Sequence, residues 1–200
     1  MTIELARRRG EASGIDALEW APRWTDSPDA DAYSRVTDPE RFRVLQPFVL
    51  AVLADLEAEF NVRREPAGTF SGGAAEHVRW SDPVRLVPAD AKAAPLTVAF
   101  TSFPGVLVRF GEATDVVLPF CGCDACDDLV QHLVEDLRFH VEALVTGGFA
   151  EWHDAKGAGH RFAVGAWGTN SSFTPSDDPP TISPFRHDWA PWPLRVTASR

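Results

Sequence analysis

The stretch that decides the fold runs from residue 96 to residue 120 and reads L-T-V-A-F-T-S-F-P-G-V-L-V-R-F-G-E-A-T-D-V-V-L-P-F. β-Branched and aromatic residues form three runs here, with breaks at Pro104-Gly105 and between Gly111 and Asp115. Short runs of this composition, separated by turn residues, are typical of β-hairpins. The stretch therefore predicts a meander of about three antiparallel strands.

A helix is predicted before the meander, from residue 38 to residue 60. Its apolar residues recur at intervals of three and four, which indicates one buried face: Val49, Val52, Leu53, Leu56 and Phe60. Asp38 is predicted to cap this helix and Pro39 to take its first position. Pro47 lies inside the pattern and is predicted to kink or split the helix.

A second helix is predicted after the meander, beginning near Asp127 and ending at Gly147-Gly148. Its buried face follows the same spacing: Leu129, Leu133, Leu137, Val141 and Leu144. In the first helix, Asp55, Glu57 and Glu59 are expected on the solvent side, between the apolar positions.

Further strands are predicted at V-R-R-E-P (62–66), within residues 76–87 with a turn or bulge at Asp82-Pro83, at F-A-E-W-H (149–153) and at R-F-A-V-G-A-W-G (161–168). Hairpins link these strands, and helices do not, so the pairing should be mainly antiparallel. We predict an α+β fold with a mainly antiparallel sheet of five to seven strands and two main helices packed on one face. Residues 1–37 are predicted to form an N-terminal arm, and residues 38–200 a single domain whose segment 169–200 is irregular.

Composition limits the partners of this chain. Its 200 residues carry a formal net charge of −10, with a pI near 5.0. Nucleic acids and anionic membranes attract basic surfaces, so we expect neither as a partner. The beginning of the chain lacks the apolar run of a secretory signal, and an odd number of closely spaced cysteines does not suit a secreted disulfide framework. We expect a cytoplasmic protein, with the small-molecule or protein partner left open.

All three cysteines lie in one short stretch, C-G-C-D-A-C-D-D, at Cys121, Cys123 and Cys126. Three interpretations stay open. The thiols can bind a metal, which would be zinc, since thiolates hold zinc in a tetrahedron of four ligands. They can perform redox chemistry through the C-x-x-C pair Cys123 and Cys126. They can also simply be packed, because free cysteine is often buried as a small hydrophobic residue.

Each interpretation has a specific difficulty. A zinc site needs a fourth ligand, for which Asp124, Asp127, His153 and His160 are candidates, whereas His132 is poorly placed on the helix. A redox site needs a stabilised thiolate, and the surrounding aspartates disfavour one. Under the packing interpretation those aspartates cap the second helix. Its difficulty is that three thiols lie within six residues of a chain that has no other cysteine.

The same motif, followed by a helix and by G-G-F-A-E (147–151), resembles an uncharacterised actinobacterial family known only as a domain of unknown function, with a C-x-C-D-A-C-D-[DE] motif. The resemblance covers residues 119–151. It implies a bacterial cytosolic protein and implies no activity.

Two other groups are candidates for a site in an enzyme of unknown reaction. Three polar residues, His153, His160 and Asp188, can supply a general base with an orienting partner. The segments W-A-P-R-W (20–24) and W-A-P-W (189–192) can meet in an aromatic groove near them, or can fasten the ends of the chain to its body. No nucleophile motif such as G-x-S-x-G and no phosphate-binding loop accompanies them.

Overall fold

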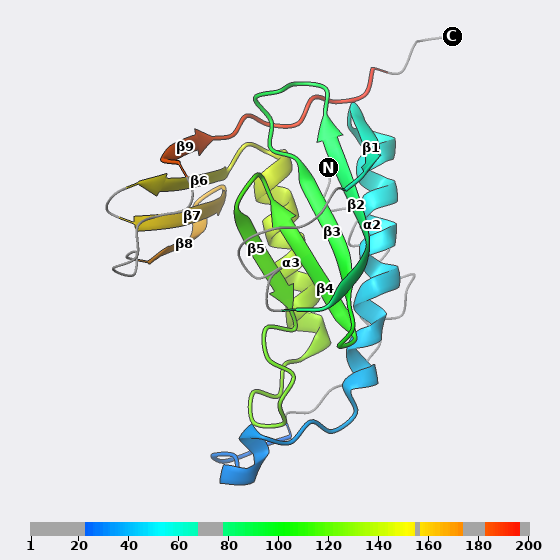
Figure 1. Cartoon of the computed structure of the whole chain (residues 1–200), viewed down its shortest axis with the longest axis vertical. Coiled ribbons are helices and arrows are strands. Elements are labelled where there is room, and N and C mark those ends of the chain that lie inside the picture. The colour runs from blue at the N-terminus through cyan, green and yellow to red at the C-terminus, as the bar shows by residue number, and fades with distance from the viewer. Residues whose placement is uncertain (1–22, 68–77, 155–156, 174–182, 197–200) are drawn as a thin grey trace.

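The strands of this α+β protein form two antiparallel sheets (Figure 1). The computed structural model describes residues 23–67, 78–154, 157–173 and 183–196. The first sheet has five strands in the order β1-β2-β3-β4-β5, and the second has four in the order β8-β7-β6-β9. The prediction of a mainly antiparallel α+β fold is confirmed, but the single sheet was wrong because the strands after the second helix form a sheet of their own.

The five-stranded sheet is the meander with two strands added at one edge. The predicted core of three strands is confirmed as β3 (Leu96–Thr101), β4 (Gly105–Phe110) and β5 (Thr114–Leu118). Two earlier strands extend it, β1 (Val62–Pro66) and β2 (Trp80–Pro88). The pairing of β2 with β3 shifts register between Ser81 and Val84, which is the bulge expected around Asp82-Pro83.

The first helical region has two parts, a 3-10 helix η3 (Pro39–Val44) and the α-helix α2 (Leu45–Glu59). Pro47 lies in the first turn of α2, a position that proline tolerates, and the predicted helix is divided into its two parts just before it. Asp38 precedes η3 as predicted, but it adopts a left-handed conformation and its side chain makes no capping hydrogen bond. The predicted apolar face is buried, and Asp55, expected in solvent, is buried with it.

The second helix, α3 (Val130–Val145), begins three residues later than predicted, and no side chain caps its N-terminus. Its buried residues join those of α2 and of the first sheet in one core cluster, which includes Leu53, Val98, Val108, Leu137 and Leu144. The packing of both helices on one face of a sheet stays a prediction.

The second sheet follows α3 and contains β6 (Phe149–Asp154), β7 (Gly157–Val164), β8 (Trp167–Phe173) and β9 (Phe185–Asp188). The run 161–168 was predicted as one strand, but the chain turns at Gly165, whose positive φ of 59° suits a glycine, and starts β8. Segment 169–200 was predicted as irregular, which is wrong for the end of β8 and for β9.

A buried carboxylate joins the two sheets. Glu151 of β6 accepts hydrogen bonds from the backbone N–H groups of Glu112 and Ala113 and from the hydroxyl of Thr114, at 2.8, 3.0 and 3.0 Å. The indole of Trp189 donates a fourth, at 3.2 Å. These contacts fasten the turn between β4 and β5 to the second sheet.

None of the helices in the described part of the chain is both long enough and apolar enough to cross a membrane.

Candidate metal centre

The cysteines lie in the loop that leaves β5 and leads to α3, at the same end of the molecule as the described part of the N-terminal arm (Figure 1). The loop starts with a cis peptide bond between Leu118 and Pro119. Gly122 then passes directly over the ring of Phe103, where an added Cβ would lie 2.2 Å from the ring atom Cζ. Only glycine allows this approach, so Gly122 fixes the path of the loop between the first two cysteines.

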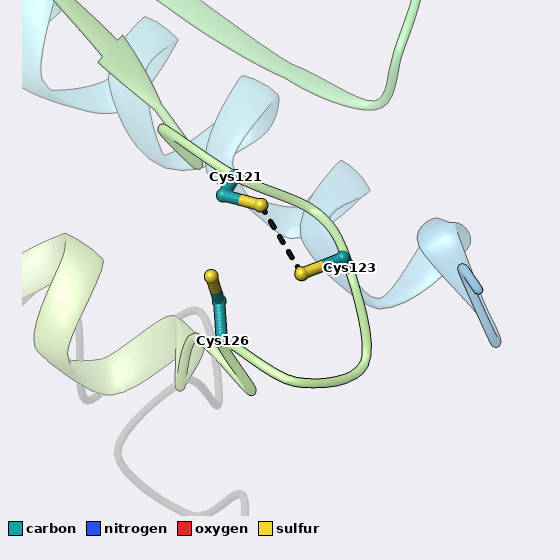
Figure 2. A group of neighbouring side chains, drawn as sticks. All are labelled: Cys121, Cys123 and Cys126. Atoms are coloured by element: carbon teal, nitrogen blue, oxygen red, sulfur yellow. Dashed lines mark hydrogen bonds between the residues drawn. The ribbon is translucent and has the colours of Figure 1, made fainter. Parts of the chain in front are cut away.

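The three sulfur atoms face a common centre (Figure 2). The Sγ atoms of Cys121, Cys123 and Cys126 all lie within 4.8 Å of one another, and those of Cys121 and Cys123 are 3.3 Å apart. All three thiols are free. Sulfur ligands of one zinc ion lie roughly 3.8 Å apart, because each Zn–S bond is about 2.3 Å long and the angles are tetrahedral. The cluster can therefore hold a metal ion.

Exposure differs among the three residues: Cys123 is buried, Cys121 is half-buried and Cys126 is exposed. The thiols also differ in acidity. A hydrogen bond from the backbone N–H of Cys126, with a second from the Cys121 thiol, lowers the pKa of Cys123. Hydrogen bonds to the sulfurs of Cys121 and Cys123 raise the pKa of Cys126 to about 12. One sulfur is thus stabilised as a thiolate, while its crowded neighbour keeps its proton.

Asp124, between the second and third cysteines, fastens this loop to the N-terminal arm. Its carboxylate is fully buried and accepts hydrogen bonds at 2.7 Å from Arg35 Nε, from the backbone N–H of Thr37 and from the Thr37 hydroxyl. Arg23 Nη1 lies 2.7 Å from the same carboxylate.

The backbone of Asp124 is bound to the arm as well. Its N–H donates to the carbonyl of Arg35, and its own carbonyl accepts from the indole of Trp24, both at 2.8 Å. The arm thus surrounds Asp124 from several sides.

Burial alone would raise the pKa of Asp124, but the hydrogen bonds from Arg35 and Thr37 and the charge of Arg23 outweigh it and hold this pKa well below its usual range. The carboxylate is therefore an anchor for the arm. Its donors occupy both oxygens, so it does not serve as the fourth zinc ligand for which it was a candidate.

Asp127 is engaged in a similar way. The backbone N–H of Arg23 donates to Asp127 Oδ2 at 2.6 Å, and Asp127 itself adopts a left-handed conformation with φ of 46°. It does not cap α3, whose N-cap residue is Leu129. The expectation that the aspartates cap the second helix is therefore wrong: no side chain caps α3, and Asp124 and Asp127 bind the arm instead.

The two histidines proposed as zinc ligands belong to the second sheet. His153 of β6 stacks on Phe185, and His160 of β7 contacts the ring of Phe162. Neither joins the thiol cluster, which is the one group of at least three closely spaced metal-binding side chains among the described residues.

The proposed histidine and aspartate site does not assemble in one place. His153 and His160 share one face of the second sheet, since Glu151 pairs with His160 and side chains alternate along β6. Asp188 pairs with Ala150 and so lies on the opposite face, where Arg186 binds it at 3.1 Å. The predicted combination of His153, His160 and Asp188 is therefore not supported by the geometry.

The two W-A-P segments fasten different parts of the protein. Trp24 binds the thiol loop, whereas the indole of Trp192 is buried and donates to the carbonyl of Ala94 at 2.8 Å. Trp20 lies outside the described residues. The contacts of Trp24 and Trp192 support the role of fastening the ends of the chain, and these two side chains form no shared groove.

Reasoning from sequence missed the anchoring role of two buried carboxylates, Asp124 and Glu151. The burial of Glu151 could have been inferred, because it is a charged residue between apolar neighbours in a short predicted strand. The partners of Asp124 are 87 and 89 residues away in the chain, and no local pattern indicates them.

A model of one protein family matches residues 8–196, and its description is "Family of unknown function (DUF6226)". The match shows a family of unknown function over nearly the whole chain, beyond the residues 119–151 of the resemblance. No curated protein matches the chain, and no solved structure matches it.

Proposed function

Because the chain belongs to DUF6226, a family whose description names no activity, we propose a function from the thiol site alone: the protein binds one zinc ion through Cys121, Cys123 and Cys126. The observation that carries this proposal is the convergence of three free sulfurs within 4.8 Å. Thiolate ligands favour zinc and copper(I) over the harder divalent ions.

The surroundings of the loop support a site formed before the metal arrives. Gly122 is fitted against Phe103, and Asp124 is bound by Arg35 and Thr37 on the other side of the loop. Residues that orient the ligands of a metal commonly raise its affinity by roughly 10–100-fold. The loop therefore presents its sulfurs with little rearrangement.

We place this function in the cytoplasm, where thiols stay reduced and available to a metal. The three cysteines are free, which agrees with that environment. The mode of action is binding, and a catalysed reaction is not part of the proposal.

Metal analysis of the full chain tests the proposal. Protein purified without chelator should contain about one zinc ion per chain, as expected for a mononuclear thiolate site. Serine at any one of the three cysteines should lower the affinity by more than the roughly 10–100-fold that loss of a supporting residue costs. His132→Ala is the matched control, since this exposed histidine lies on α3 close to the loop and outside the cluster. A wild-type protein that neither contains nor takes up zinc would refute the proposal.

A second candidate function is thiol redox chemistry, favoured by the 3.3 Å separation of Cys121 Sγ and Cys123 Sγ. Here two thiols would lose two electrons and two protons to an oxidant and form a disulfide. The C-x-x-C pair of the sequence, Cys123 and Cys126, lies within the same 4.8 Å cluster. Mild oxidation of metal-free protein, followed by a count of free thiols, tests this candidate. If all three thiols survive, it is excluded.

A further inference from the structure

We infer that the metal site has an open fourth position, and that this position takes an exogenous thiol. The inference rests on the proposed zinc site and goes further, because it assigns the chemical class of the ligand. Zinc bound to thiolates is four-coordinate, and a site with three protein ligands keeps its remaining position for water or an added ligand.

The first argument is the donor set itself. Within the described parts of the chain, the group of mutually close ligand atoms contains the three sulfurs and no carboxylate or imidazole. Each carboxylate of the loop has a hydrogen-bond partner of its own. Asp124 is held by Arg35 and Thr37, and Asp127 accepts from the backbone of Arg23. The remaining one, Asp128, accepts from the backbone N–H of Cys121.

The second argument is access. Cys126 is exposed, so the cluster is open to solvent on its side, whereas Cys123 is buried on the other. Phe120, next to Cys121 in the chain, is 92% exposed. This exposed aromatic ring, one residue from the cluster in the chain, gives an incoming organic ligand an apolar surface to contact.

The third argument is the chemical preference of the metal. Soft sulfur ligands suit zinc, and four thiolates form one of its commonest protein sites. An exogenous thiol would complete that set. It would bind as the thiolate, release one proton to solvent and displace the water in the fourth position, with no change of oxidation state.

Cobalt(II) is the probe for this inference, because the visible absorption of cobalt in a zinc site reports the number and type of its ligands. Full-length protein is loaded with Co²⁺ under argon without thiol reductants and titrated with β-mercaptoethanol. We expect a saturable change in the visible bands at about one thiol per metal, with the metal retained after desalting. Ethylene glycol, which replaces the thiol by a hydroxyl, should leave the spectrum unchanged.

The source of the thiol is tested by a second arm of the same titration, in which a short peptide with one cysteine replaces β-mercaptoethanol. Binding of both indicates that a protein cysteine can reach the site. Binding of β-mercaptoethanol alone indicates a small-molecule thiol.

Three outcomes would overturn the inference. A spectrum that stays constant while cobalt remains bound would mean that the protein itself supplies the fourth ligand. Loss of cobalt to the added thiol would mean that the thiol competes for the metal. Failure of the wild-type protein to bind cobalt or zinc at all would instead refute the proposed function, and this result is distinguishable from the other two.

Discussion

Arg35 and Asp124 lie 89 residues apart in the sequence and 2.7 Å apart in the structure, measured from Arg35 Nε to Asp124 Oδ2. Asp124 stands between Cys123 and Cys126, so the contact fastens the N-terminal arm directly to the candidate metal site. Whatever fixes this loop also favours docking of the arm, and by thermodynamic linkage the docked arm favours a loop that is ready for metal.

Replacement of Asp124 by asparagine should therefore loosen the arm and weaken metal binding together. The amide keeps the shape of the side chain but loses the charge that attracts Arg23 and Arg35. We expect faster hydrogen exchange in residues 23–37 and an affinity for zinc lower by roughly 10–100-fold. Mass spectrometry of exchange and a competitive zinc titration measure the two effects.

Asp31→Asn is the matched control, because it removes the same charge from an exposed position of the arm. It should leave both measurements close to those of the wild type. Equal hydrogen exchange of residues 23–37 in the Asp124→Asn variant and the wild type would show that docking of the arm does not depend on this carboxylate.

Alanine at Gly122 should disturb the site through sterics alone. The new Cβ would lie 2.2 Å from Phe103 Cζ, so the ring or the loop must move. We expect weaker zinc binding in Gly122→Ala and partial recovery when Phe103→Ala is added, since the smaller residue removes the clash. A double-mutant cycle of zinc affinities tests this, and additive effects of the two changes would contradict it.

Stability should fall in mild acid because of His140. This side chain of α3 lies among Phe110, Phe162 and His160. Burial, with a smaller effect of the nearby His160, lowers the pKa of His140 from 6.5 to about 4. The unfolded chain therefore binds a proton that the native state does not bind between these values, and stability is lost as the pH falls from about 6.5 to about 4.

The full effect is about 3 kcal/mol in the free energy of unfolding. Urea unfolding of the wild type and of His140→Leu at pH 7 and near pH 4 measures it. The variant should lose less stability than the wild type over this range, whatever its stability at pH 7. Parallel losses in the two proteins would show that other groups control the acid response.

Replacement of Glu151 by glutamine should weaken the contacts between the two sheets and lower the free energy of unfolding. The carboxylate accepts from four donors, and an amide would turn an N–H group toward at least one of them. Hydrogen bonds to a charged group are worth about 1.5–3 kcal/mol each, so we expect a loss of about 3 kcal/mol in the free energy of unfolding.

Glu112→Gln is the control for the Glu151 variant. Its exposed side chain pairs with Arg85 at 3.3 Å, and such surface pairs contribute about 1 kcal/mol or less. Similar losses in the two variants would show that the contacts of Glu151 do not carry the connection between the sheets.

Regular patterns explain what the sequence could predict. The spacing of Val49, Val52 and Leu56 indicates a helix because 3.6 residues make one turn. The breaks at Pro104-Gly105 and Gly111 indicate hairpins because those residues suit turns. The clustering of Cys121, Cys123 and Cys126 in the sequence made a common site one of three open interpretations, but it did not determine that their sulfurs face one centre.

The parts that could not be predicted depend on distant contacts. No local pattern links Asp124 to Arg35 or Glu151 to Thr114, because each pair meets only after the sheets have formed. Gly165 was misread within a strand since its positive φ is a property of the folded backbone. The division into two sheets likewise follows from pairing choices that periodicity does not encode.

Because every cysteine of the chain lies in one loop, thiol-reactive labels attach at a single place in the structure. A maleimide dye or a spin label will attach only between residues 121 and 126, where Cys126 is the exposed one of the three cysteines. The indole of Trp24, bound to the carbonyl of Asp124, lies close enough to such a label for energy transfer to report when the arm departs. Because the chain has seven tryptophans, comparison with a Trp24→Phe variant assigns the energy transfer to Trp24 and so follows movement of the arm.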